Sequence, residues 1–69
     1  MTYSYNKLWK LLIDKNMMKK DLMAKTKITS STIAKMGRGE AVSMDVLGRI
    51  YEVLNCNIGD LVDFIKDEE

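Results

Sequence analysis

The chain has 69 residues, of which 46% are hydrophobic and 30% charged, with a formal net charge of +1, one cysteine, no histidine and no proline. This length fits one domain, residues 1–69, near the lower limit for folding around a single core. The composition excludes an internal disulfide, a metal site built from cysteine and histidine, and an apolar membrane span. We therefore expect a cytoplasmic protein with no metal and no cofactor, in which Cys56 is a buried thiol and the N-terminus carries no secretory signal.

The first two helices are predicted by the spacing of their apolar residues. A helix over about residues 5–15 has apolar side chains three and four positions apart, and Asn16 ends it. Its apolar residues are Leu8, Trp9, Leu11, Leu12 and Ile13. A second, short helix runs from Lys19 to about Lys25, with Leu22 facing inward and Asp21 in the first turn, where a negative charge suits the helix dipole.

The third predicted helix, Ser30 to Met36, begins with a run of four hydroxyl residues at positions 29–32. Thr29 is its natural N-cap, because a hydroxyl there can accept a hydrogen bond from a free backbone N–H. Gly37 is expected to close the helix in the left-handed conformation that glycine tolerates. Four hydroxyls are poor helix formers, so their presence at the start of a helix needs a further explanation.

Two more helices are predicted in the C-terminal half. Ser43 caps the first of them, and its apolar positions follow the full i, i+3, i+4, i+7 pattern. These positions are Leu47, Ile50, Tyr51 and Leu54. Asn55 or Asn57 ends that helix, and Asn57 with Asp60 resembles a capping box that opens a fifth helix from Ile58 to about Ile65. No segment alternates with period two over enough residues to predict a strand, so the expected fold is all-α.

Only Thr26-Lys27-Ile28 separates the second and third helices, which is the layout of a helix-turn-helix. The segment DLMAKTKITSSTIAKM resembles the helix-turn-helix of Cro and phage-repressor (lambda-repressor-like) transcriptional regulators. The flanking segments NKLWKLLIDKNMMKK and VSMDVLGRIYEVLNCNIGDLV resemble the first and the last two helices of small, stand-alone members. This resemblance covers residues 6 to about 65. It implies a compact five-helix DNA-binding domain of bacterial or phage type, with the helix-turn-helix at about 19–36 and the recognition helix at about 30–36.

The chain matches the family at the apolar positions that lock the two helices together and departs from it elsewhere. The matching residues are Leu22, Ile28 and Ile33. Met23 stands where the family usually has alanine, and Met18 replaces the usual Ser/Thr cap of the second helix. Lys27 stands where the family usually has a glycine with positive φ, at a cost of roughly 1 kcal/mol.

The resemblance implies that the third helix enters the major groove of double-stranded DNA. Short hydroxyl side chains suit that place, because they can reach base edges without clashing and can donate to or accept from several bases. Lys35 would reach guanine or a phosphate, Thr29 would mainly cap, and Lys19, Lys20 and Arg38 would contact phosphates. The candidate DNA-binding residues are Lys19, Lys20, Thr29, Ser30, Ser31, Thr32, Lys35 and Arg38.

The charges of the chain are divided unevenly. Residues 1–40 hold nine basic and three acidic residues, a balance of +6, whereas residues 41–69 hold two basic and seven acidic residues, a balance of −5. Such a division lets one face of the molecule meet a polyanion. The plainer alternatives are that the lysines and Arg38 are solvated surface charges and that the hydroxyl run is a capping cluster.

Hydroxyl contacts are individually weak, so we expect a homodimer that binds two half-sites about one DNA turn apart. The chain also has more apolar residues than one small core should need. They include Trp9, Ile13, Val53, Val62, Phe64 and Ile65. The predicted dimer surface is the fifth helix with the end of the fourth. In the alternative, Trp9 and Phe64 pack on one another and complete the core of the monomer.

The predicted function is sequence-specific DNA binding as a small transcriptional regulator, with repression as the expected role, although the residues do not distinguish a repressor from an activator. The alternative is a protein-interaction module of the same fold that binds another regulator or a toxin. An enzyme acting on a small-molecule substrate is not expected, because the chain has no histidine, no glycine-rich phosphate loop and no base partner for Cys56.

Overall fold

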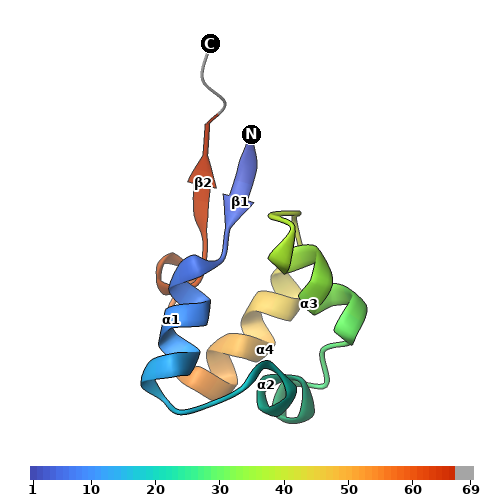
Figure 1. The fold of residues 1–69 in the computed structure, drawn as a ribbon, viewed down its shortest axis with the longest axis vertical. Helices are drawn as coiled ribbons and strands as arrows, with labels where there is room; N and C mark the ends of the chain where they lie inside the picture. The colour runs from blue at the N-terminus through green and yellow to red at the C-terminus, as the bar shows by residue number, and fades with distance from the viewer. Residues whose placement is uncertain (67–69) are drawn as a thin grey trace.

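The computed structural model describes residues 1–66, and its main body is a bundle of four short helices (Figure 1). The helices are α1 (Asn6–Asp14), α2 (Lys19–Thr26), α3 (Ser30–Gly37) and α4 (Met44–Leu54). A single 3₁₀ turn, η1 (Ile58–Asp60), follows α4, and two strands, β1 (Thr2–Ser4) and β2 (Asp63–Ile65), project together from one end of the body. None of the helices in this described part is long and apolar enough to cross a membrane.

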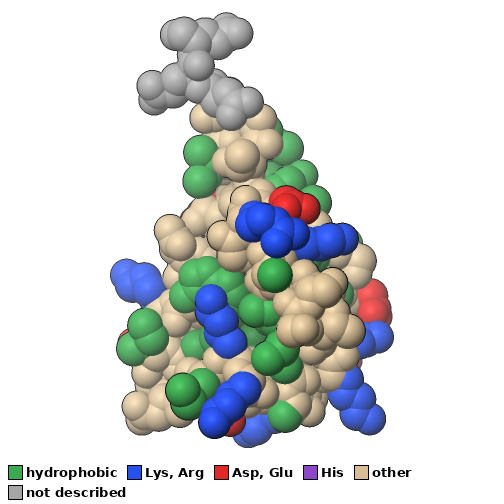
Figure 2. Space-filling view, turned by 45° about the vertical axis from the view of Figure 1, so that its right-hand side comes forward, with side chains coloured by type: hydrophobic (Ala, Val, Ile, Leu, Met, Phe, Trp, Pro, Cys, Tyr) green, Lys and Arg blue, Asp and Glu red, His purple; other side chains and the backbone are tan. Residues whose placement is uncertain are grey.

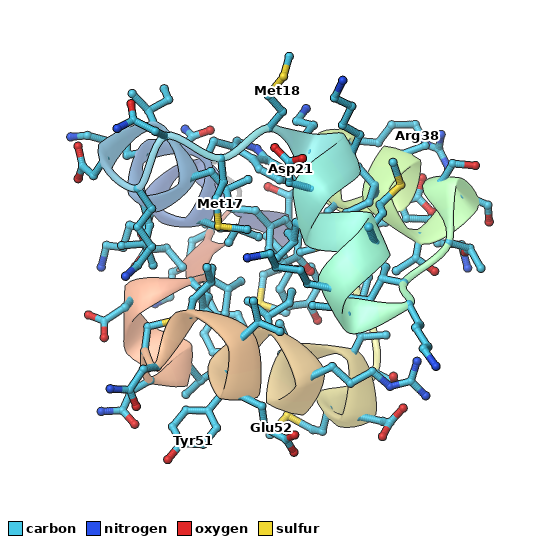
Figure 3. The ribbon with its side chains drawn as sticks, turned by 90° about the horizontal axis from the view of Figure 1, so that it is seen from below. Met17, Met18, Asp21, Arg38, Tyr51 and Glu52 are labelled. Atoms are coloured by element: carbon cyan, nitrogen blue, oxygen red, sulfur yellow. The ribbon has the colours of Figure 1, made fainter. Side chains whose placement is uncertain are left out.

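The helical core consists largely of the residues that the apolar spacing predicted. All four helices contribute, and α2 packs against α4. The buried apolar residues are Tyr5, Leu8, Leu12, Leu22, Ile28, Ile33, Met36, Leu47, Ile50, Leu54, Cys56 and Leu61. Tyr51 is an exception, because half of its surface is exposed and its ring points away from the body (Figure 3).

The predicted N-caps of α3 and α4 are confirmed. The Thr32 amide donates to Thr29 Oγ1 at 3.3 Å, and the Val46 amide donates to Ser43 Oγ at 3.2 Å. Each bond satisfies one of the backbone donors that the first turn of a helix leaves free. The two caps therefore fix where α3 and α4 begin.

The expected ends of the helices are confirmed at Asn16 and Asn55, which have positive φ values of 56° and 54°. The prediction for Gly37 is wrong, because Gly37 is the last residue of α3 and the left-handed residue is Gly39, at φ 73°. A Cβ atom on Gly39 would lie 2.7 Å from the Tyr3 carbonyl oxygen. The chain therefore needs glycine at residue 39, where the loop after α3 passes against β1.

The predicted fold is confirmed as mostly helical, but the predictions of a fifth helix and of no strand are wrong, because the structure has four α-helices and one short strand pair. The capping box is present, with the Asn57 amide donating to the Asp60 carboxylate at 3.1 Å, but it opens only the single turn of η1. The chain then extends into β2, which pairs antiparallel with β1, with Tyr3 opposite Phe64. This pairing joins segments about 60 residues apart, so a pattern search within either segment could not find it.

Side-chain contacts hold the strand pair on the helical body. The rings of Tyr3 and Phe64 meet edge to face with centroids 5.5 Å apart. Lys7 of α1 forms an ion pair with Asp63 at 3.1 Å and donates to the Gly59 carbonyl at 3.2 Å. Phe64 remains 74% exposed, so the alternative in which it packs with Trp9 to complete the core is not what the structure shows.

Candidate nucleic-acid interface

The leading end of α3 presents hydroxyl groups in two different settings. Ser30 and Ser31 are exposed. Thr29 and Thr32 are tied together, because their hydroxyl oxygens lie 3.1 Å apart in addition to the capping bond between them. The run is therefore partly a capping cluster, as the plainer alternative had it, and two serines remain directed to solvent.

The turn between α2 and α3 fixes the angle at which α3 is presented. The three apolar positions that match the family are buried, with Leu22 at 0%, Ile28 at 5% and Ile33 at 7% exposed. Lys27 takes the left-handed conformation at φ 60°, which confirms the strained position that the resemblance implied. The turn is the tight connection between two packed helices that this motif requires.

Sequence reasoning missed the part played by Thr26. This buried residue donates from its hydroxyl to the Leu22 carbonyl at 2.6 Å and accepts from the Ile28 amide at 3.3 Å. It therefore satisfies the first amide after the turn at a place where Lys27 has left the helical conformation. A hydroxyl residue directly before a predicted turn was the only signal that could have pointed to it.

Lys19 and Lys20 are the first two residues of α2, as predicted, and both are exposed. The Lys19 ammonium lies 4.3 Å from the centre of the Trp9 ring, a cation–π contact that holds the charge at this end of the helix. The Met18 side chain has no oxygen that could cap α2. The Met18 amide instead donates a hydrogen bond to the Asp21 carboxylate at 2.8 Å. The positive end of α2 and its two lysines therefore lie together at the surface.

Lys35 lies in the middle of α3, next to a recess that the sequence did not predict. The recess has a volume of about 290 Å³ and lies between α3 and the start of α4. It is lined by Thr32, Lys35, Ala41, Val42, Ser43 and Val46. The loop of residues 41–43 is therefore a neighbour of the candidate site, brought there by the turn at Gly39.

Arg38 lies at the opposite end of α3 from the serines, about 12 Å away along the helix axis at 1.5 Å per residue. Its side chain is not free, because its Nε donates to the Glu40 carboxylate in an exposed ion pair. The hydrogen bond from Arg38 holds the pKa of the Glu40 carboxyl below its ordinary value, and the nearby charges of Arg38 and Lys35 act in the same direction. Glu40 was not among the predicted site residues.

The side of the molecule that carries α3, turned forward in Figure 2, shows Lys and Arg side chains at several places. Seen from below, Met18 and Arg38 point to one side, whereas Tyr51 and Glu52 of α4 point to the opposite side (Figure 3). Arg38, the labelled candidate residue, therefore points away from the side of α4 that carries Glu52.

Cys56 is buried as expected. Burial is the main cause that raises the pKa of its thiol, and the Asp60 carboxylate adds to the effect. Such a thiol stays protonated at neutral pH and is a poor nucleophile and a poor metal ligand. An open recess of about 470 Å³ beside it is lined by Lys7, Lys10, Leu11, Asp14, Lys15, Leu54, Asn55, Cys56 and Asp60.

Comparisons with known proteins agree with this geometry. The crystal structure of the transcriptional regulator VanUg, form II, superposes with a TM-score of 0.91 at 47% sequence identity, and the match covers 96% of this chain and 88% of that one. A search of curated proteins gave no match. The profile of the Cro/C1-type HTH DNA-binding domain matches residues 7–67. This chain therefore belongs to the Cro/C1-type helix-turn-helix DNA-binding domain family.

Proposed function

We propose that this protein is a sequence-specific transcriptional regulator that binds double-stranded DNA with α3 in the major groove. The observation that carries the proposal is the leading end of α3, where Ser30 and Ser31 are both exposed at the start of the helix. The similar solved structure is described as a transcriptional regulator, which agrees with this use of the fold.

Each candidate residue has a role in the proposed complex. Ser30 and Ser31 contact base edges, while Thr32 and Lys35, further along α3, contact bases or the adjoining phosphates. Lys19 and Lys20 bind a phosphate at the positive end of α2. Thr29 acts through its cap on α3, and Arg38 contacts a phosphate at the far end of that helix.

The proposed protein acts as a homodimer, with a contact surface that differs from the one predicted from sequence. The predicted fifth helix is absent, and Phe64 and Ile65 of that segment lie on the edge strand β2. There Phe64 is 74% and Ile65 is 47% exposed. An edge strand with exposed apolar side chains favours association with another chain. We therefore assign the dimer contact to β2.

The dimer contact has its own test. Replacing Phe64 with serine should lower the molar mass measured by light scattering from dimer to monomer while the helical circular dichroism is unchanged. Replacing the equally exposed Ile13 (73%), on α1, with serine should leave the dimer intact. A wild-type protein that stays monomeric at all concentrations and on DNA would contradict the homodimer.

Repression is the simplest outcome of such binding, because a protein that occupies a promoter site excludes polymerase from it. We propose this role, and with it a place in the cytoplasm, where the DNA of a bacterium or phage would be bound. A reporter gene behind the selected site should be expressed less when the protein is present. Raised expression would identify an activator instead.

The test of DNA recognition is in-vitro selection from a random duplex library at about 0.15 M salt, with Ser31→Ala and Lys35→Ala beside the wild type. We expect a two-fold symmetric motif that changes or disappears in both variants. Glu52→Gln, on the face opposite Arg38, is the control and should select the wild-type motif. Salt-sensitive binding without any enriched motif would contradict base reading and favour a partner-binding module.

A further inference from the structure

The loop after the recognition helix carries an acidic side chain next to two of the candidate DNA contacts. Glu40 accepts a hydrogen bond from Arg38 Nε, and Lys35 lies near enough to lower the pKa of its carboxyl together with Arg38. The other two acidic residues among residues 1–40 lie elsewhere. Asp14 is the last residue of α1, and Asp21 accepts a hydrogen bond from the Met18 amide. Among the acidic residues of this segment, Glu40 is therefore the one that lies beside the C-terminal end of α3.

The backbone holds Glu40 in this position without help from its own carboxylate. The Glu40 amide donates to the Lys35 carbonyl at 3.0 Å, and the Tyr5 hydroxyl donates to the Glu40 carbonyl at 2.8 Å. The preceding residue, Gly39, accepts from the Tyr3 amide at 3.1 Å. Because these bonds involve only main-chain atoms of residues 39 and 40, the carboxylate is presented by a fixed loop and can be neutralised without disturbing it.

Arg38 has two competing partners once DNA is present. Its guanidinium can keep the Glu40 carboxylate or exchange it for a phosphate oxygen, since both are anions that accept from the same donors. Exposed ion pairs are weak and exchange readily, so this competition modulates DNA binding and does not block it.

We propose that Glu40 is a specificity-determining residue that restrains sequence-independent DNA binding by holding Arg38. In a loose encounter with an arbitrary sequence, Arg38 stays on Glu40 and contributes little to the attraction. When α3 is bound to its correct site, the phosphate beside the C-terminal end of the helix is held in a fixed position. It then replaces Glu40 as the partner of Arg38. The inference rests on the proposed function and assigns a role to a residue outside the predicted site.

The experiment measures the binding of wild type and Glu40→Gln to a random-sequence duplex and to the selected site over a range of salt concentrations. Glu40→Gln should bind the random duplex about two- to fivefold more tightly, in keeping with the small coupling energies of exposed ion pairs. The slope of log affinity against log salt should steepen by about one counterion, because one more cation meets a phosphate. Binding to the selected site should tighten less, so the ratio of specific to non-specific affinity should fall.

Two further variants separate this role from a general charge effect. In an Arg38→Gln background, Glu40→Gln should no longer change non-specific affinity, because the partner through which it acts is gone. Glu52→Gln removes the same charge from the opposite face and should have no effect on either duplex. A Glu40→Gln effect that persists without Arg38, or one that Glu52→Gln reproduces, would overturn the proposal. Equal affinities of wild type and Glu40→Gln would also overturn it, whereas a wild type that binds no DNA would overturn the proposed function itself.

Discussion

The helical body and the strand pair of this molecule differ in how far apart in the sequence their contacting residues lie. In the segment 6–54, α2, α3 and α4 begin at local capping hydrogen bonds, and every helix buries residues a few positions apart. The strands β1 and β2 instead depend on each other across the whole chain, with Thr2 opposite Ile65. The first region carries the proposed DNA contacts, and the second carries Phe64 and Ile65, the exposed apolar residues of the proposed dimer contact.

The difference between the two regions also gives the loop of residues 38–40 its importance. This loop follows α3, and the amide of Tyr3 in β1 donates to the Gly39 carbonyl in the loop. The same tyrosine contacts Phe64 of β2 with its ring. Changes in the helical body should therefore affect stability as a whole, while changes at this junction should affect the fit between the two regions.

The largest effect is expected in the helical body, from Leu22→Ala. Leu22 is 0% exposed and lies where α2 meets α3 and α4, so its loss leaves a cavity. A buried Leu→Ala change typically lowers the free energy of unfolding by about 2–5 kcal/mol. Urea unfolding followed by circular dichroism measures it, with Ile13→Ala, at a position 73% exposed, as the near-neutral control. Equal losses in the two variants would contradict the core described here.

A smaller effect is expected at the junction, from Gly39→Ala. The new Cβ would lie 2.7 Å from the Tyr3 carbonyl oxygen at a residue with φ 73°, so both sterics and backbone conformation oppose it. The conformational part alone costs about 1–2 kcal/mol. Gly37→Ala is the matched control, because a Cβ there meets nothing within 4 Å. Thermal unfolding should show a clear loss for residue 39 only, and comparable melting temperatures would argue against contact between this loop and β1.

The parts of the fold and of the candidate site that depend on neighbouring residues could be predicted from the sequence, and the parts that depend on distant residues could not. The helices and the caps at Thr29 and Ser43 follow from local spacing and local hydrogen bonds, whereas the left-handed conformation of Lys27 was implied by the resemblance to the family. The strand β2 does not follow from local spacing, because its three residues acquire their conformation from β1, and in isolation they are equally compatible with a helix. The positions of the lysines on α2 were predicted for the same local reason. The pairing of Arg38 with Glu40 was not, since an ion pair two residues apart needs the turn at Gly39.

Tyr5→Phe should weaken the junction more mildly. The change removes the 2.8 Å hydrogen bond from the Tyr5 hydroxyl to the Glu40 carbonyl and keeps the ring, at a cost of about 0.5–1.5 kcal/mol. Burial raises the pKa of the Tyr5 hydroxyl, so the folded protein keeps a proton that the unfolded chain loses. This contribution to stability is present at neutral pH and is lost as the pH rises above about 10, the ordinary pKa of tyrosine.

The measurement for Tyr5→Phe is therefore chemical unfolding at neutral and alkaline pH. The wild type should lose more of its free energy of unfolding between the two conditions than the phenylalanine variant does. Tyr51→Phe, at an exposed position on α4, is the control and should follow the wild type at both pH values. If Tyr5→Phe had the same pH dependence as wild type, the Tyr5 hydroxyl would not be the group that titrates.

The smallest effect is a gain in stability within the helical body, from Lys27→Gly. Lys27 has φ 60°, a conformation that costs a side-chain residue roughly 1–2 kcal/mol and glycine almost nothing. Glycine loses more entropy on folding, so the net gain should be at most about 1 kcal/mol. Lys25→Gly removes the same charge inside α2 and should instead cost about 1 kcal/mol, because glycine is a poor helix former. The opposite signs of these two changes, read from urea midpoints, test whether the turn before α3 is strained; a loss in both variants would contradict the left-handed conformation of Lys27.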